Sequence, residues 1–135
     1  MELAREVVRA HRTGQPLGLA FVDVDNLKAV NDGRGHVAGD RLLVRVADTL
    51  RARLRPYDLV IRYGGDEFVC ALPNLDEAGV AGRLAPVNVV LGDGPDPGSV
   101  TIGTAALRSG DSVDDLVGRA DAVLYRARRR RRLNP

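Results

Sequence analysis

The sequence predicts an α+β domain in which one mostly antiparallel sheet is flanked by helices. Short apolar runs at residues 17–22, 59–61, 68–72 and 100–107 have the length and composition of strands. The longer stretches around them repeat apolar residues at helical spacing, most clearly in 37–54 and from residue 112 onward. The chain has 135 residues and no linker, which predicts a single domain over residues 1–135.

The composition excludes a membrane span and an internal disulfide. No apolar stretch approaches the roughly 20 residues that a transmembrane helix needs, and no signal peptide opens the chain, so we expect a cytoplasmic protein. The single cysteine, Cys70, lies in a strand-like run and is expected to be a small core residue. The net charge is only +2, but arginines at 126 and 128–132 concentrate positive charge near the C-terminus.

The first elements are a helix, a buried strand and a second helix. Residues 2–13 have helical spacing, and Gly14-Gln15-Pro16 ends that helix. The run 17–22 is continuously apolar, as in a central strand covered on both faces, and it leads into Asp23-Val24-Asp25. The polar residues 26–36 predict a loop or a short helical turn before the helix at 37–54.

A hairpin follows, and its turn is the most informative stretch of the chain. The runs on either side are joined across Gly64 and Gly65, where we expect a tight primed turn with positive φ. Asp66 and Glu67 come directly after it, and an acidic pair beside bare backbone suits a metal ion that carries a bulky ligand. The alternative is a surface hairpin with an acidic shoulder. We also expect Arg62 and Glu67 to face each other across the hairpin, so a structural ion pair is a competing role for both.

The last third predicts smaller elements and then a long helix. Residues 74–84 favour a short helix weakened by glycines, 86–91 a strand, 92–98 a surface loop, and 100–107 a further strand. Ser112 then caps the final helix, with Asp115 at the capping-box spacing.

The predicted order of strands and helices brings separate acids together. Strand, helix, strand, strand, helix, strand is the split β-α-β order (βαββαβ) of ferredoxin-like domains. There the first strand pairs antiparallel with the third, so Asp23 should lie beside Asp66 and Glu67. Such acids repel one another unless a cation joins them. Mg²⁺ binds carboxylates together with phosphate oxygens, and two such ions can clamp the oxygens of a nucleotidyl transfer.

The hairpin residues Gly64-Gly65-Asp66-Glu67-Phe68 resemble the motif that names the GGDEF family, the bacterial diguanylate cyclases. Residues 21–32 and 35–40 are similar to the family's first strand and base-binding segments, 101–103 to its late strand, and 120–127 to its final helix. The resemblance implies a palm-like fold related to nucleotide cyclases. It also implies a homodimer in which two GTP molecules condense to cyclic di-GMP and two pyrophosphates.

The resemblance also implies roles for individual residues. Metal binding, to Mg²⁺ or Mn²⁺, would fall to Asp23, the carbonyl of Val24, Asp66 and Glu67. Asp66 and Glu67 would form the catalytic pair, with Glu67 at the second metal or assisting deprotonation of the 3′-hydroxyl. The implied substrate-binding residues are Asn31 and Asp40 for guanine, Lys28, Arg128 and Arg132 for the triphosphate, and Gly64 and Gly65 at the tip.

Arg55-Pro56-Tyr57-Asp58 matches the family's RxxD inhibitory site, where Arg55 and Asp58 would bind the product cyclic di-GMP. Arg83 is a further candidate for that site. The alternative for Arg55 and Asp58 is an ordinary helix-to-strand turn with a surface ion pair.

The sequence departs from the family pattern at three places. The usual segment before the first helix and any sensory domain are absent, and the segment 74–98 is short. Arg128 replaces the usual lysine, and Arg131 stands where the family ends its helix with glycine. Two alternatives to an active cyclase remain: a receptor that binds cyclic di-GMP without turnover, and a nucleic-acid binder using the C-terminal arginines. The intact hairpin motif argues against the first, and the lack of stacking aromatics argues against the second, so we expect no nucleic-acid partner.

Overall fold

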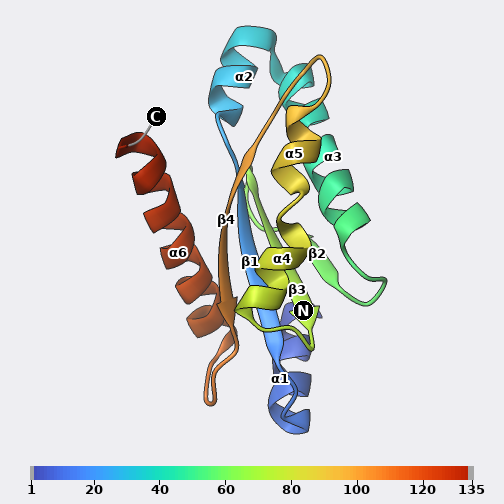
Figure 1. The fold of residues 1–135 in the computed structure, drawn as a ribbon, viewed down its shortest axis with the longest axis vertical. Coiled ribbons are helices and arrows are strands. Elements are labelled where there is room, and N and C mark those ends of the chain that lie inside the picture. The colour runs from blue at the N-terminus through green and yellow to red at the C-terminus, as the bar shows by residue number, and fades with distance from the viewer. Residues whose placement is uncertain (1, 134–135) are drawn as a thin grey trace.

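A four-stranded antiparallel sheet in the order β2-β3-β1-β4 lies at the centre of the structure, a computed structural model that describes residues 2–133 (Figure 1). Its strands are β1 (Leu17–Val24), β2 (Leu59–Arg62), β3 (Glu67–Pro73) and β4 (Val100–Ala106). The helices are α1 (Glu2–Thr13), α2 (Leu27–Arg34), α3 (His36–Arg53), α4 (Glu77–Leu84), α5 (Val87–Gly92) and α6 (Val113–Leu133). None of these helices combines the length and hydropathy that crossing a bilayer requires. The ferredoxin-like strand order expected from the sequence is confirmed.

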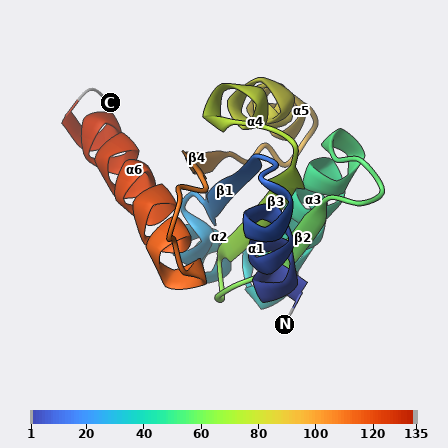
Figure 2. The same cartoon turned by 90° about the horizontal axis from the view of Figure 1, so that it is seen from below.

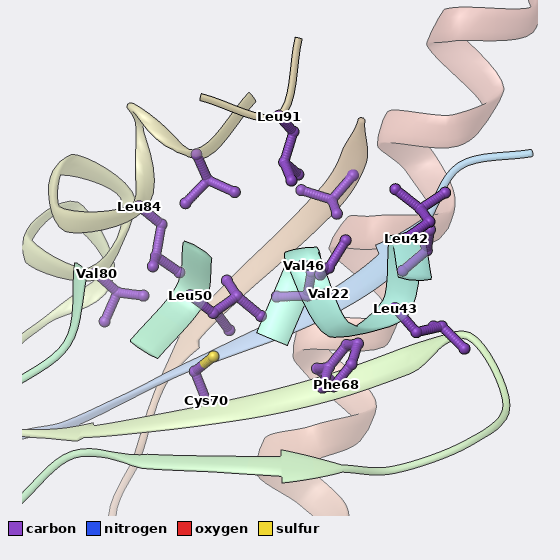
Figure 3. Close-up of a cluster of buried hydrophobic side chains, with 14 of the residues drawn as sticks. Val22, Leu42, Leu43, Val46, Leu50, Phe68, Cys70, Val80, Leu84 and Leu91 are labelled. Atoms are coloured by element: carbon purple, nitrogen blue, oxygen red, sulfur yellow. The ribbon is translucent and has the colours of Figure 1, made fainter. Parts of the chain in front are cut away.

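Helices cover both faces of the sheet (Figure 2). Each face has its own hydrophobic cluster. Helices α3, α4 and α5 pack over the face that carries Val22 and Cys70, as Figure 3 shows in close-up. Helices α1 and α6 pack over the opposite face, which carries Leu19 and Phe21. The sheet is therefore the middle layer between two helical layers.

Strand β1 is buried along its whole length, as expected for a central strand. Its side chains alternate between the two clusters because successive residues of a strand point to opposite faces. Leu19 and Phe21 belong to the cluster with α6, so Asp23 lies on the α6 face as well. Asp25 follows the end of the strand and contacts α6 through Arg131. The alternation along β1 therefore directs Asp23 toward α6 and away from α3, α4 and α5.

Helix α6 begins at the predicted capping box. The backbone N–H of Asp115 donates to Ser112 Oγ at 3.1 Å, and the backbone N–H of Ser112 donates to Asp115 Oδ2 at 2.9 Å. The helix then lies directly on β4, because a side chain at Gly103 would overlap the carbonyl of Ala120 and the backbone of Leu124. The absence of a side chain at Gly103 thus sets the distance between helix and sheet.

Two segments differ from their predicted conformation. Residues predicted as a loop or short turn form the eight-residue helix α2. The run 86–91 was predicted as a strand, and this is wrong: it forms the short helix α5. Val87 and Leu91 lie one helical turn apart and are both fully buried, so burial of that pair outweighs the strand propensity of the valines.

The predicted primed turn with positive φ at Gly64 and Gly65 is also wrong, since neither glycine has positive φ. Four residues connect β2 to β3, and the backbone N–H groups of Tyr63 and Gly64 both donate to Glu67 O, at 2.8 and 3.3 Å. A connection of this length can reverse the chain without left-handed backbone. At Gly64 the missing side chain instead leaves space for the carboxylate of Glu67.

Cys70 is fully buried between the sheet and α3–α5 (Figure 3). Burial raises the pKa of its thiol to about 12, so the reactive thiolate is not populated at neutral pH. The expectation that Cys70 is a core residue is confirmed.

The contact at Gly103 gives a testable prediction about stability. Gly103→Ala should lower the free energy of unfolding by about 3 kcal/mol, because the added methyl group forces α6 away from β4. The matched control is Gly118→Ala in α6, where a side chain meets nothing within 4 Å and should stabilise the helix by up to ~1 kcal/mol. Chemical denaturation measures both, and equal effects at the two positions would contradict the close approach.

Candidate active site

The antiparallel pairing of β1 with β3 brings together the acids that the sequence separates. Asp23 lies directly opposite Glu67 in the ladder. The backbone N–H of Val24 donates to the carbonyl of Asp66 at 2.9 Å, which continues the pairing to the hairpin tip. The structure thus places the three predicted acids, Asp23, Asp66 and Glu67, at one end of the sheet.

Burial makes this group of acids electrostatically costly. Asp23 is only 6% exposed, and burial raises the pKa of its carboxyl to about 6 against the opposing influence of Arg128, with further increases from Asp66 and Glu67. The pKa of Glu67 is raised by burial and by the charges of Asp66 and Asp121. Each carboxylate therefore favours a nearby positive charge.

Arg128 of α6 supplies a positive charge at this site. Its Nη1 lies 2.8 Å from Asp23 Oδ2, and its Nη2 lies 3.8 Å from Asp25 Oδ1. The other oxygen of Asp23, Oδ1, is buried and has no hydrogen-bond partner among residues 2–133. The resemblance assigned Arg128 to the triphosphate, whereas in the structure it contacts the expected metal ligand.

Asp25 and Arg131 were assigned no role from the sequence, yet they belong to the same network. Asp25 accepts hydrogen bonds from Ser99 Oγ at 2.6 Å, from Thr101 Oγ1 at 2.7 Å, and from Arg131 Nη1. Burial on its own would raise the pKa of Asp25, but these hydrogen bonds outweigh it and hold the pKa below its ordinary value.

Sequence periodicity contained a signal for both residues. Asp25 follows Asp23 by two positions, directly after the end of β1, and Arg131 follows Arg128 by about one helical turn.

The tip of the hairpin is bare backbone. A side chain at Gly64 would overlap the carboxylate of Glu67, whereas a side chain at Gly65 would meet nothing within 4 Å. The prediction that Arg62 faces Glu67 is wrong, because Arg62 pairs with Phe68 in the ladder. Its guanidinium donates instead to the carbonyls of Gly64 and Gly65, at 3.3 and 2.8 Å. Arg62 therefore supports the tip and leaves Glu67 available.

The predicted guanine-binding residues lie on α2 and α3. Asn31 packs its side-chain amide against Gly39, where even a methyl group would overlap it. Asp40 follows Gly39 in the chain and is exposed in α3. This contact brings Asn31 close to Asp40. Lys28 is exposed on α2, and Arg132 is exposed near the end of α6.

The predicted inhibitory residues bind each other. Arg55 Nε and Nη2 donate to Asp58, the shortest of these bonds being 2.8 Å, and Nη2 also donates to Pro73 O at 2.7 Å. The Asp58 side chain is fully buried and that of Arg55 is 20% exposed. Both residues line a hollow of about 450 Å³ that also includes Glu2 and Arg51. Arg83 is not among its lining residues.

A divalent cation fits the donor chemistry at the end of the sheet, although in the described part of the chain no three acidic, His or Cys side chains are positioned to hold one together. Carboxylate oxygens are the ligands that Mg²⁺ prefers. The buried, partnerless Asp23 Oδ1 supplies an oxygen for such an ion. The donor chemistry of these residues therefore fits a divalent cation.

Comparisons with known proteins agree with the resemblance in the sequence. Residues 1–134 match the family model described as "Diguanylate cyclase, GGDEF domain". Diguanylate cyclase DgcP of Pseudomonas aeruginosa is 38% identical over 134 residues, which are 94% of this chain and 20% of that protein. For diguanylate cyclase DosC of Escherichia coli the identity is 35% over 136 residues, covering 95% of this chain and 30% of the relative. The chain thus spans less than a third of these relatives.

Solved structures share the fold. The GGDEF domain of DgcB from Caulobacter crescentus, in complex with c-di-GMP, superimposes with a TM-score of 0.88 at 30% identity, covering 95% of this chain and 81% of that one. The active GGEEF domain of a diguanylate cyclase from Vibrio cholerae gives a TM-score of 0.90 at 27% identity, covering 96% and 86%.

The opposite pKa shifts of Asp23 and Asp25 predict opposite effects on stability. The folded protein holds the proton of Asp23 up to pH ~6, against an ordinary pKa of 3.8, so the free energy of unfolding falls as pH rises through that window. Asp23→Asn mimics the neutral acid, and without divalent cations it should raise the free energy of unfolding at pH 8 by about 2 kcal/mol.

Asp25→Asn is the matched comparison. Because the folded-state pKa of Asp25 is lowered, its charge stabilises the fold above the ordinary pKa of 3.8, and that contribution is lost as the pH falls below it. The substitution should lower the free energy of unfolding at pH 8 by about 2 kcal/mol. Urea denaturation in a chelating buffer measures both variants, and shifts of the same sign would contradict the assignment.

Proposed function

The chain belongs to the GGDEF family of diguanylate cyclases, and we propose that it condenses two GTP molecules into cyclic di-GMP and two pyrophosphates. The position of Asp23 opposite Glu67, next to the open backbone of Gly65, is the observation that carries this proposal. It gives one place where carboxylates for cations and space for a triphosphate coincide. A receptor that binds cyclic di-GMP without turnover is the alternative that the activity test below decides.

Each residue then has a defined part in the reaction. Asp23, Asp66 and Glu67, with the carbonyl of Val24, would hold Mg²⁺ or Mn²⁺. The cation, when bound, stabilises charge that develops on the α-phosphate and on the leaving pyrophosphate. Asn31 and Asp40 would read the guanine edge, since an amide and a carboxylate complement its acceptor and donors. Lys28 and Arg132 would bind phosphate oxygens.

The stoichiometry requires two copies of the domain. One site presents one GTP, and the 3′-hydroxyl of each GTP must attack the α-phosphate of the other. Each attack forms a bond from O3′ to phosphorus, breaks the bond to the β-phosphate, releases pyrophosphate, and passes the hydroxyl proton to Glu67 or to water. We therefore propose a two-fold homodimer as the active form.

Replacing one acid tests the activity. With GTP and Mg²⁺ the chain should produce cyclic di-GMP, and Asp66→Ala should lower the rate by about a thousandfold because it removes a ligand of the cation that would stabilise developing charge. The fold should be kept, because Asp66 lies outside the strands. Nucleotides are resolved by chromatography, with Asp48→Ala, an exposed acid of α3, as the control.

The assay needs a dimer to be decisive. Fusion to a dimeric coiled coil raises the effective concentration of the second site. If the fused protein binds cyclic di-GMP but leaves GTP untouched, the chain is a receptor and the proposed activity is wrong.

We propose that Arg55 and Asp58 bind the product as an inhibitory site. The domain of DgcB was solved with c-di-GMP, and a hollow adjoins Arg55 here. Arg55 Nη1 has no hydrogen-bond partner among residues 2–133 and remains for a phosphate oxygen. Asp58 can reach guanine only if its ion pair with Arg55 opens, because its side chain is fully buried.

Calorimetry tests this site directly. Arg55→Ala should weaken the binding of cyclic di-GMP at least ~10-fold, since it removes a charge-assisted contact to phosphate. Arg53→Ala removes a nearby arginine that does not line the hollow and is the control. Because Arg55→Ala also breaks an ion pair, Arg55→Lys serves as a second variant that keeps the charge. Unchanged affinity in both Arg55 variants would refute the site.

A further inference from the structure

The last turns of α6 place two arginines against the acidic end of the sheet. Arg128 contacts Asp23, and Arg131 contacts Asp25. The resemblance to the family gives Arg128 a place at the triphosphate, but it gives Arg131 none, because the family has glycine there. The structure therefore places Arg128 on an expected metal ligand instead of a free phosphate site, and it places Arg131, which has no assigned role, beside it.

Arg131 is anchored through one nitrogen of a guanidinium whose side chain is 55% exposed. Its Nη1 donates to Asp25 and, at 3.1 Å, to Thr101 Oγ1 of β4. Asp25 is itself held by the hydroxyls of Ser99 and Thr101, and its backbone N–H donates to Ser99 O at 3.0 Å. These contacts join the end of β1, the start of β4 and the end of α6. The anchor fixes the helix one turn beyond Arg128.

Arg128 lies in a position where its charge matters. Its side chain is 33% exposed, while that of Asp23 is 9% exposed, so the pair is shielded from water more than an ordinary surface ion pair. The guanidinium of Arg128 lies within ion-pair distance of two carboxylates, those of Asp23 and Asp25. The arginine occupies Asp23 Oδ2 and leaves only Oδ1 of that carboxylate.

We propose that Arg128 is a resident counter-cation on Asp23, held there by Arg131 and Asp25 as positioning residues, and that a divalent cation must compete with it. A divalent cation without a nucleotide should bind weakly. The guanidinium of Arg128 repels it, and Oδ2 of Asp23 is already paired with that guanidinium. A divalent cation that binds together with a nucleoside triphosphate brings phosphate oxygens, which are a new anionic partner for Arg128. The arginine thus couples binding of the cation to binding of the nucleotide.

The inference rests on the proposed function only in the identity of the nucleotide, and its central test uses no GTP. The probe is Mn²⁺ alone, titrated into the purified chain at pH 8 and constant ionic strength and followed by electron paramagnetic resonance. Arg128→Ala should bind Mn²⁺ roughly threefold to tenfold more tightly, because a competing positive charge beside the acids is gone.

The control removes the same charge from the same helix. Arg126 is exposed. Within residues 2–133 it forms no ion pair with Asp23 or Asp25. Arg126→Ala should change Mn²⁺ affinity by less than about twofold, since exposed charges at a distance are screened. If Arg128→Ala binds Mn²⁺ no more tightly than Arg126→Ala, the proposal is overturned. Thermal unfolding confirms that each variant is folded, and Arg128→Gln is the second variant.

A double-mutant cycle tests the positioning role of Arg131. Arg131→Ala should tighten Mn²⁺ binding about twofold when Arg128 is present, and it should have no effect when Arg128 is already alanine. A merely structural or a purely electrostatic role predicts the same effect in both backgrounds, and that result would refute positioning. Arg131→Gln replaces Arg131→Ala if alanine destabilises the fold.

The coupling is measured by repeating the titration with a non-hydrolysable GTP analogue. The analogue should tighten Mn²⁺ binding more in the unmodified chain than in Arg128→Ala. Only in the unmodified chain can Arg128 move from Asp23 to the phosphate oxygens and so free the carboxylate for Mn²⁺. Equal tightening would overturn the coupling. Loss of cyclase activity leaves the Mn²⁺-only result standing, and an active enzyme with unchanged Mn²⁺ affinity overturns this inference alone.

Discussion

The antiparallel pairing of β1 with β3 is the constraint from which the rest of the site follows. It places Asp23 opposite Glu67 and continues to the carbonyl of Asp66, so carboxylates distant in the sequence become neighbours. Buried acids at such short range raise one another's pKa and resist ionisation. Two features of the structure reduce this repulsion: Arg128 pairs with Asp23, and the hydroxyls of Ser99 and Thr101 donate to Asp25. A divalent cation would reduce it further.

Helix α6 provides the resident response. Its approach to β4 at Gly103 is close enough that no side chain fits between them, and this contact aims the last turns of the helix along the acidic end of the sheet. Arg128 and Arg131 reach Asp23 and Asp25 from there. Both aspartates face α6, yet two hydroxyl groups donate to Asp25 and none to Asp23, which explains why their pKa values move in opposite directions.

Much of the fold could be predicted because its signals are local. The apolar runs of β1 and β3, the capping box of α6 and the helical period of α3 each depend on a few consecutive residues, and all were confirmed. The predictions were wrong where the conformation of a segment depends on more than its own residues. Burial of Val87 and Leu91 turned a strand-like run into α5, and a four-residue connection removed the need for positive φ at Gly64.

The sequence by itself determined the antiparallel pairing of the first strand with the third, the family and the identity of the acids, because motif spacing and hydrophobic period are properties of the chain. Only the tertiary structure decided which charges meet. Arg128 contacts Asp23 and Arg131 contacts Asp25, although the members of each pair lie far apart in the sequence. The physical reason is that a long arginine side chain selects its partner by the packing of helix on sheet, which no single segment encodes.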